Sequence, residues 1–319
     1  MKRTPLLGLL ALAAILHASA AETGSAVMKS VTYKRVADLE IKADVYYFPD
    51  GKARPVVVWL HGGALMMGNR EGRFPWRDMI LTNEYALVSL DYRLAPQAKL
   101  PAIIEDIEDA FRWIRGEGAK EFHLDPQRIA VMGGSAGGYL TLMTGYRVDP
   151  RPRVLVSLYG YGDIIGDWYT TPSPHPRHNR KKYTEAEAWE AVKGPVVAND
   201  RERQQGHVFY DYCRQNGLWP KMVSDWDPKA ETEKFHPFMP SRNVTEKYPP
   251  TVLIHGTTDT DVPFEQSTIM AEEFKRHGVP FKFYQIDGGE HGLGGGNPAE
   301  IANAYVKAFE FVKARLEAP

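Results

Sequence analysis

The sequence predicts an α/β fold with a mostly parallel eight-stranded sheet and helices on both of its faces. Short apolar runs alternate along the chain with amphipathic stretches, and turn residues separate them. A run that is apolar throughout is typical of a strand covered on both faces, and strands that alternate with helices favour a parallel sheet. The eight predicted strands are residues 31–36, 41–48, 56–60, 86–90, 129–132, 154–158, 251–254 and 281–286. The first two alternate apolar and polar residues in the manner of antiparallel strands.

The helices are predicted from apolar residues at three- and four-residue spacing. Between Ile103 and Ile114 this spacing is regular, and acidic residues lie between the apolar positions, as on an amphipathic helix. Pro101 suits the first turn of that helix, and Gly116 suits its end. Three further helices are expected over residues 135–146, 264–277 and 298–316.

One long region interrupts the alternation of strands and helices. Residues 162–245 contain a proline-rich segment and no clear strand pattern. More than half of the chain's seven tryptophans lie here, namely Trp168, Trp189, Trp219 and Trp226. Because the strand pattern resumes at Thr251, we expect an insertion after the sixth strand that packs over the sheet edge as a cap. A separate domain is the alternative.

The first twenty residues have the pattern of a secretory signal peptide. Lys2 and Arg3 precede an apolar stretch over residues 6–16, and Ala18-Ser19-Ala20 provides an A-x-A cleavage site. The apolar stretch is well short of the roughly 20 residues that a membrane span needs. We therefore expect a signal peptide over residues 1–20, export to a periplasm or beyond, and one domain over residues 21–319 that contains the cap.

The composition is that of a globular chain. Its 319 residues are 43% hydrophobic and 25% charged, with a formal net charge of -1, which argues against a disordered or polyanion-binding protein. We therefore expect no nucleic-acid partner, and we interpret the basic run at residues 177–182 as a solvated loop. Cys213 is the only cysteine, so no intramolecular disulfide can form. We expect this thiol to be a small buried residue rather than a nucleophile.

The apolar run at residues 129–132 ends in Gly133-Gly134-Ser135-Ala136-Gly137-Gly138. A phosphate-binding loop would need a lysine after the last glycine, or G-x-G-x-x-G after the first strand, and neither is present. Two interpretations remain, a plain turn and a nucleophile elbow. In an elbow, a strand, a sharp turn and a helix hold the serine hydroxyl at the sheet edge. A serine nucleophile at Ser135 also needs a base, an orienting acid and oxyanion donors.

The chain order expected with such an elbow is serine, acid, histidine. His291 lies in a glycine-rich loop just after the last predicted strand and is the predicted base. His255, at a strand end, and His277, in a helix, are the alternatives. Asp259 and Asp261 both follow the seventh strand and both qualify as the acid. Asp261 also suits the N-cap region of the next helix.

Backbone N–H groups are the expected donors to a developing oxyanion. His61, Gly62, Gly63 and Ala64 follow the third strand, where the second donor segment of elbow enzymes lies. We assign the N–H groups of Gly63 and Ala64, together with that of Ala136 after the nucleophile, to the oxyanion hole.

Five segments, in chain order, resemble the motifs of one superfamily. They are His61-Gly62-Gly63-Ala64, Asp91-Tyr92-Arg93-Leu94-Ala95-Pro96, residues 125–138, residues 256–263 and His291-Gly292. On these motifs the chain resembles the α/β-hydrolase superfamily, specifically its esterase/lipase branch with hormone-sensitive-lipase-like and carbohydrate esterases. The resemblance implies the α/β-hydrolase fold and Asp259 as the acid. Ala64 stands where the resembled HGGG motif has its last glycine.

The resemblance implies a serine esterase that is active on short-acyl or aryl esters through an acyl-enzyme. The aromatic cap and the expected export together extend the expected substrates to acetyl or feruloyl esters of plant polysaccharides. An exported serine peptidase or aminopeptidase-like hydrolase and a non-catalytic binding protein on this scaffold are the alternatives. We expect no cofactor and no metal, because the pair His175 and His178 lacks a third convergent ligand. The candidate substrate contacts, which could instead form the cap's own core, are Trp168, Tyr169, Trp189 and Trp219.

Overall fold

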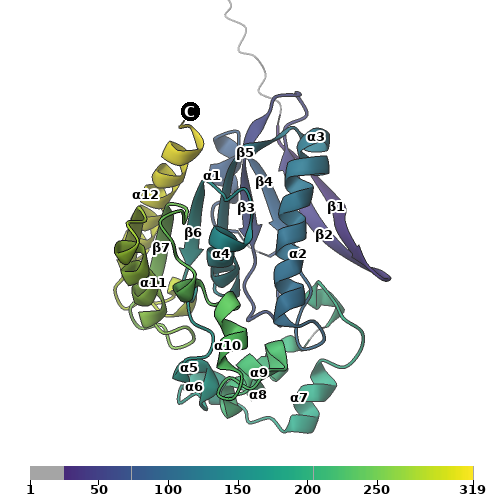
Figure 1. Cartoon of the computed structure of the whole chain (residues 1–319), viewed down its shortest axis with the longest axis vertical. Helices are drawn as coiled ribbons and strands as arrows, with labels where there is room; N and C mark the ends of the chain where they lie inside the picture. Colours follow the sequence, from purple (N-terminus) through teal and green to yellow (C-terminus); the bar gives the residue numbers. More distant parts are fainter. Residues whose placement is uncertain (1–24, 73, 204, 319) are drawn as a thin grey trace, which may run out of the picture.

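Eight strands form one sheet in the computed structural model, which describes residues 25–72, 74–203 and 205–318 (Figure 1). The strand order is β1-β2-β4-β3-β5-β6-β7-β8. The strands from β3 to β8 are parallel to one another, whereas β2 is antiparallel to both β1 and β4. The bounds are β1 Val27–Val36, β2 Leu39–Tyr47, β3 Arg54–Leu60, β4 Ala86–Leu90, β5 Leu124–Gly134, β6 Val154–Leu158, β7 Thr251–Gly256 and β8 Phe281–Ile286. The predicted fold class is confirmed, whereas the predicted signal peptide lies outside the described residues.

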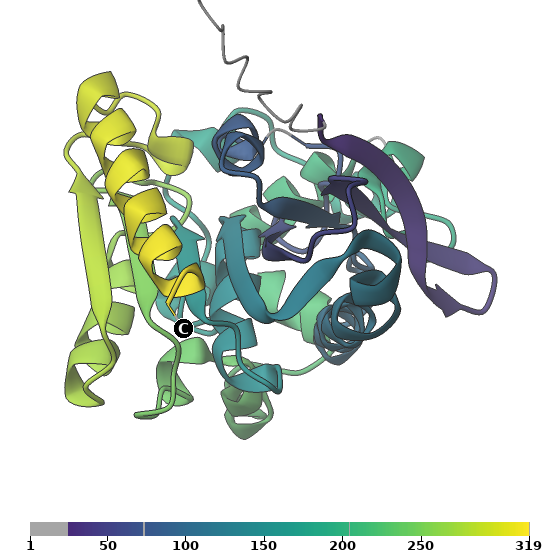
Figure 2. The ribbon, with the colours of Figure 1, turned by 90° about the horizontal axis from the view of Figure 1, so that it is seen from above.

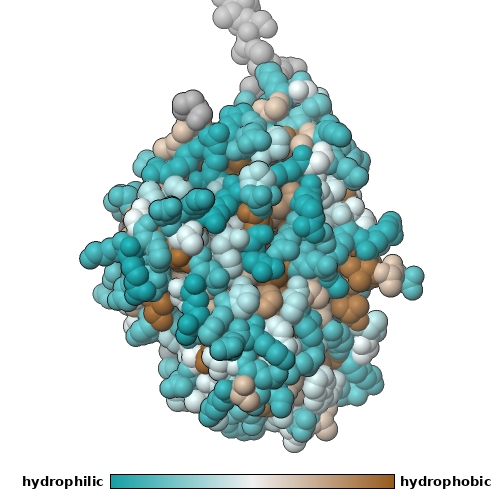
Figure 3. Space-filling model, viewed as in Figure 1, coloured by the Kyte–Doolittle hydropathy of each residue, from teal (hydrophilic) through white to brown (hydrophobic). Residues whose placement is uncertain are grey.

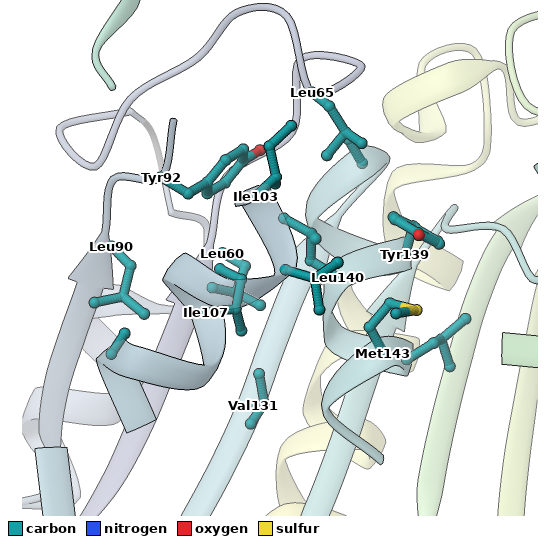
Figure 4. Close-up of a cluster of buried hydrophobic side chains, with 14 of the residues drawn as sticks. Leu60, Leu65, Leu90, Tyr92, Ile103, Ile107, Val131, Tyr139, Leu140 and Met143 are labelled. Atoms are coloured by element: carbon teal, nitrogen blue, oxygen red, sulfur yellow. The ribbon is translucent and has the colours of Figure 1, made fainter. Parts of the chain in front are cut away.

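The sheet lies between two layers of helices because its central strands are apolar on both faces. All residues of β3, β4 and β6 are buried. On one face, a large cluster of buried side chains includes residues of α2, α4 and α11, and on the other face a second cluster includes residues of α1 and α12. Figure 4 shows side chains of the first cluster from β3, β4, β5, α2 and α4 pointing toward one another. The bounds of these helices are α1 Arg77–Thr82, α2 Leu100–Trp113, α4 Ala136–Arg147, α11 Glu265–Arg276 and α12 Pro298–Leu316.

The first long helix does not end at Gly116, so that prediction is wrong. Helix α2 continues through a π-helical turn, η1 Ile114–Gly118, into α3 Ala119–Phe122. The helical path ends at His123, which has a left-handed backbone with φ 53°. A glycine inside a helix destabilises it by roughly 0.5–1 kcal/mol, and burial of Ile114 and Phe122 in the core offsets this cost.

Figure 2 shows the sheet twisting from the β1–β2 hairpin at one side to β8 and α12 at the other.

Helices are the only regular secondary structure described between β6 and β7, since residues 159–203 and 205–250 contain no strand. In Figure 1 these helices gather at the end of the molecule that lies away from the C-terminus. We call residues 162–245 the cap. Its helices are α5 Asp167–Thr170, α6 Pro176–Asn179, α7 Glu185–Ala191, η2 Asp200–Glu202, α8 Gly206–Asn216, α9 Trp219–Ser224, α10 Thr232–Phe235, η3 His236–Phe238 and η4 Pro240–Arg242.

The face of the molecule drawn in Figure 3 is mostly hydrophilic, with hydrophobic residues scattered over it. Within the described ranges, every helix is too short or too polar to cross a membrane. Cys213 is buried, and burial raises the pKa of its thiol. A thiol with a raised pKa forms little thiolate, which agrees with the expected packing role.

The layer over β5 should be sensitive to loss of volume. Leu140 in α4 is fully buried, so Leu140→Ala should lower the free energy of unfolding by roughly 2–5 kcal/mol. Val306 in α12 is 47% exposed, so Val306→Ala should change the free energy of unfolding by less than about 0.5 kcal/mol. Urea denaturation followed by circular dichroism measures both, and equal effects of the two variants would contradict the described packing.

Candidate active site

Ser135 lies at the sharp turn between β5 and α4. Its backbone has φ 57° and ψ -122°. This conformation is energetically unfavourable for any residue that has a Cβ atom. A side chain on Gly137 would overlap the carbonyl oxygen of Leu60, so only glycine fits there. The turn therefore has the strand, strained serine and helix of a nucleophile elbow, and a plain turn would not need this strain.

The structure brings together Ser135, His291 and Asp259 from three distant parts of the chain. His291 begins the short turn η5, His291–Leu293, after β8, and Asp259 follows β7. His291 Nε2 lies 3.0 Å from Ser135 Oγ, and His291 Nδ1 lies 2.7 Å from Asp259 Oδ2. Because an ionised carboxylate only accepts hydrogen bonds, Nδ1 carries the proton and Nε2 is free to accept the serine proton. This is the arrangement of a nucleophile, a base and an orienting acid.

The pKa values of the two ionisable partners support these roles. Burial by itself raises the pKa of the Asp259 carboxyl, but hydrogen bonds from His255 and His291 outweigh burial and lower this pKa to about 2. Burial also lowers the pKa of His291, but the hydrogen bond to Asp259 and the negative charge of Asp261 outweigh it, so this pKa is raised. Asp259 is therefore ionised at neutral pH and stabilises the imidazolium form of His291.

His255 acts on the acid rather than on the serine. This ring is fully buried, with Nε2 3.2 Å from Asp259 Oδ2 and Nδ1 2.7 Å from Ser267 Oγ. Because the Asp259 carboxylate can only accept a hydrogen bond, the proton of the His255 ring is on Nε2. His255 therefore donates to Asp259 Oδ2, the oxygen that also faces His291. The other alternative base, His277, is exposed and lies 3.8 Å from Glu273. The sequence placed His255 at a strand end but had no signal for its contact with the acid.

Asp261 does not cap the next helix, so that interpretation is wrong. The N-cap residue of α11 is Phe264. The Asp261 side chain instead points toward the cap, where its Oδ1 accepts hydrogen bonds from Tyr210 and His178. Asp259 and Asp261 are nevertheless linked, because Asp259 Oδ1 accepts a hydrogen bond from the Asp261 N–H at 2.8 Å.

The loop after β3 lies directly against the elbow. A Cβ atom on Gly62 would lie 3.2 Å from Ser135 Cβ, so a side chain there would crowd the serine. In the part of the chain that the structure describes, the N–H groups of Gly63, Ala64 and Ala136 donate no hydrogen bond. Free N–H groups at this place can receive a developing oxyanion.

Two aromatic contacts hold this loop. The Tyr92 hydroxyl donates to the carbonyl oxygen of His61 at 2.8 Å, and the two rings stack with centroids 4.2 Å apart. Burial lowers the pKa of His61 to about 4, so the ring is uncharged at neutral pH. On the cap side, Trp219 Nε1 donates to the carbonyl oxygen of Ala64 at 2.9 Å.

The four aromatic residues predicted to contact substrate lie elsewhere than expected. Tyr169 and Trp219 are buried and stack on each other with ring centroids 4.1 Å apart, and Trp168 stacks on Tyr169. Trp189 is 41% exposed and packs edge-on against Phe209. The structure therefore corrects the predicted role of three of them. Trp168, Tyr169 and Trp219 form a core inside the cap, because their flat faces pack on one another rather than on a cavity.

A cavity of about 680 Å³ is lined by Asp261, whose Oδ2 lies 3.7 Å from His291 Nε2. Neither the three triad residues nor the four predicted aromatic residues line it. Its lining comes from Met67 in the loop after β3, from the loops after β7 and β8, from cap helices α6 and α8, and from Arg180 just after α6. Most of the lining side chains are polar or charged, among them Arg177, Arg180, Asp211 and Glu290. Asp211 is half-buried, and burial raises its pKa to about 6.

Two family models match separate parts of the chain. A model described as BD-FAE matches residues 43–157, and a model described as the prolyl oligopeptidase family matches residues 208–318. Ser135 lies within the first match, and Asp259 and His291 lie within the second.

Solved structures share the fold over most of the chain. An α/β-hydrolase superfamily protein from Enterococcus faecalis has a TM-score of 0.69 and 20% identity, covering 91% of this chain and 99% of that chain. An acetyl ester-xyloside bifunctional hydrolase from Caldicellulosiruptor lactoaceticus has a TM-score of 0.62 and 21% identity, covering 93% and 96% of the two chains. These likenesses establish the predicted α/β-hydrolase fold.

Among curated proteins, the non-reducing polyketide synthase atr1 of Stereocaulon alpinum is 24% identical over 307 residues. The alignment covers 83% of this chain and 12% of that protein. The chain therefore spans a small part of the length of the curated relatives that it matches.

The charge network around His291 can be tested by titration. We expect the pKa of His291, followed by NMR of its ring protons, to lie above 6.5 in the unmodified protein. Asp259→Asn removes the charged partner of Nδ1, so it should lower the His291 pKa by roughly 1–3 units. Asp78→Asn, at a side chain that is 91% exposed, is the matched control and should leave it unchanged. A His291 pKa that is unaffected by Asp259→Asn would contradict the described contact.

Proposed function

We propose that this chain, which has the α/β-hydrolase fold and resembles the esterase branch, is a serine esterase that hydrolyses short-acyl or aryl carboxylic esters through an acyl-enzyme. One observation carries the proposal: a continuous line of hydrogen bonds runs from the Ser135 hydroxyl through both ring nitrogens of His291 to Asp259. Serine is a weak nucleophile at neutral pH, and an adjacent base of this kind activates it.

In the acylation half of the reaction, Ser135 Oγ attacks the ester carbonyl carbon while its proton passes to His291 Nε2. The carbonyl oxygen becomes an oxyanion, which accepts hydrogen bonds from the N–H groups of Gly63, Ala64 and Ala136. His291 then gives the proton to the leaving alcohol oxygen as the bond from carbon to that oxygen breaks. The acyl group remains on Ser135, and Asp259 keeps its own charge throughout.

In the deacylation half, a water molecule takes the place of the alcohol beside His291 Nε2. The base removes a proton from this water, and the resulting hydroxide attacks the acyl carbonyl carbon. The oxyanion forms again at the same three N–H groups. Collapse of this intermediate returns the proton to Ser135 Oγ and releases the carboxylic acid, so the enzyme regains its starting state.

The polar cavity next to Asp261 favours a polar leaving group over a long hydrocarbon chain. Charged side chains such as Arg180 and Asp211 would lose hydration against a lipid tail, and this loss opposes binding. Hydroxyl groups of a sugar can hydrogen-bond to the same side chains. We therefore extend the proposal to acetyl or feruloyl esters of plant polysaccharides. From the sequence pattern of residues 1–20, we also propose that the protein is exported.

A serine peptidase or aminopeptidase is the second candidate. The match of residues 208–318 to the prolyl oligopeptidase family favours it, because that stretch contains both Asp259 and His291. Amide and ester hydrolysis share the acyl-enzyme chemistry, so the triad alone supports either. A purely binding role on the same scaffold would leave the aligned hydroxyl of Ser135 without a use.

Removal of the nucleophile should abolish turnover without unfolding the protein. For Ser135→Ala we expect a loss of roughly 10³-fold or more in the hydrolysis rate of para-nitrophenyl acetate, with an unchanged circular dichroism spectrum. A fluorophosphonate probe should label the unmodified protein and not this variant. Full activity in the variant would remove Ser135 from the mechanism, and an unlabelled native protein would favour a binding role.

The substrate class should appear in a panel assayed on the purified protein. We expect higher rates on para-nitrophenyl acetate, methyl ferulate and acetylated xylan than on a long-chain para-nitrophenyl ester, because the adjoining cavity is polar. An aryl amide of leucine reports on the peptidase candidate. The highest rate on the long-chain ester would contradict the proposed specificity, and the highest rate on the amide would favour the peptidase.

A further inference from the structure

His291 lies between two carboxylates, one on each ring nitrogen. Asp259 Oδ2 contacts Nδ1 at 2.7 Å, and Asp261 Oδ2 lies 3.7 Å from Nε2. The two acids are two residues apart in the same loop, and the N–H groups of Asp261 and Val262 both donate to Asp259 Oδ1, at 2.8 and 2.9 Å. One tight turn therefore fixes both acids relative to the ring.

The cap holds Asp261 in this position through its other oxygen. Asp261 Oδ1 accepts hydrogen bonds from His178 Nε2 at 2.8 Å, the Tyr210 hydroxyl at 2.6 Å and Arg214 Nη1 at 3.1 Å. All three donors are buried cap residues. Arg214 Nη1 also donates to the Asp261 carbonyl oxygen at 2.9 Å. With Oδ1 fully used, Oδ2 is the oxygen that faces the ring.

These donors keep Asp261 ionised. Burial alone raises the pKa of its carboxyl, but the hydrogen bond from His178 and the positive charges around it outweigh burial and hold the pKa well below its usual range. Burial lowers the pKa of His178, so that ring is neutral. A neutral His178 must carry its proton on Nε2 to donate to Asp261, and Nδ1 then accepts from the hydroxyl of Ser173 at 2.8 Å.

The remaining groups that face His291 are few. From cap helix α6, Arg177 Nη2 lies 3.6 Å from Asp261 Oδ2, and its Nη1 pairs with Glu290 at 2.5 Å. Glu290, in the loop of His291 itself, accepts the His291 N–H at 2.6 Å. From the segment after β6, the uncharged ring of Tyr159 packs edge-on against the imidazole. Arg177 is thus the cation that opposes Asp261 at the ring.

We propose that Asp261 is a second positioning carboxylate for the catalytic base, held by the cap so that its Oδ2 stabilises the imidazolium from the Nε2 side. This proposal rests on the proposed function, because it assigns His291 as the base. At 3.7 Å the contact is too long for a hydrogen bond, so the stabilisation is electrostatic. The proton still moves only between Ser135, His291 and the leaving group, and Asp261 accepts none.

The contact changes the expected role of the cap. An opposite charge within about 4–6 Å favours the charged form of an ionisable group, with typical shifts of 1–3 pKa units. The imidazolium forms each time the serine or the water loses its proton, so its stabilisation lowers the free energy of both steps. The buried donors His178, Tyr210 and Arg214 thereby connect the cap to the basicity of His291.

Two variants with opposite expected signs test the proposal. Asp261→Asn preserves the shape of the side chain and removes its charge, so the His291 pKa measured by NMR should fall by about one unit, a tenfold change in proton affinity. Arg177→Gln removes the opposing cation, so the His291 pKa should rise. Asp78→Asn, at a remote and exposed carboxylate, should leave it unchanged.

The acid limb of kcat/KM on para-nitrophenyl acetate should move with the NMR values, toward lower pH for Asp261→Asn and toward higher pH for Arg177→Gln. A His291 pKa that stays constant in Asp261→Asn, or that falls in both variants, would overturn the proposal. If Asp261→Asn fails to fold, the sign of the change in Arg177→Gln still decides. The NMR titration needs no turnover. A protein that hydrolyses no ester, but whose His291 pKa falls in Asp261→Asn and rises in Arg177→Gln, would therefore refute the proposed function alone.

Discussion

The backbone contact between the end of β3 and the turn after β5 is the constraint on which the site depends. Gly137 leaves room for the Leu60 carbonyl oxygen, and Gly62 leaves room for Ser135. Two neighbouring parallel strands end at the same sheet edge, so their following loops meet there. Because no side chain separates these loops, the loop that carries the N–H groups of Gly63 and Ala64 lies directly against the turn at Ser135. A chain with alanine at these glycines would have to move one loop away from the other.

The other half of the site follows from the same geometry of the sheet. The strands β6, β7 and β8 lie in chain order beside β5, so each later loop reaches the edge next to the elbow. Asp259 and His291 are separated by 32 positions along the chain, yet their side chains meet because β7 and β8 are neighbours. The buried ring of His255 and the turn over Asp259 then fix the acid. The order of Ser135, Asp259 and His291 in the chain is a consequence of strand order.

Much of the fold follows directly from sequence pattern, because burial on both faces leaves an uninterrupted apolar run such as β3. The elbow and the base loop are also visible in sequence, since glycines around Ser135 and His291 have few other uses. The prediction that the helix ends at Gly116 was wrong, because the packing of a helix can outweigh the free-energy cost of one glycine inside it. Asp259 and Asp261 could not be separated by spacing, because both follow β7. Only the fold shows that they face different nitrogens of one ring.

The cap aromatics show a second limit of sequence. Trp168, Tyr169 and Trp219 have the residue types of a sugar site and equally those of a small core, and composition cannot distinguish the two. Their stacked rings decide for a core. The polar cavity was not expected, because its lining combines residues of α6 and α8 with Met67 and with the loops after β7 and β8, which are far from them in the chain. No local pattern announces such a combination.

The hydrogen bond from the Trp219 indole to the Ala64 carbonyl has a consequence for protein engineering. Exchanging the whole insertion for that of another protein would remove this support of the loop after β3. Modular grafting on this scaffold must therefore retain the indole and the rings stacked on it. Outlying segments such as α7, where Trp189 reaches the solvent, are the places where new sequence can be introduced without disturbing the reaction centre.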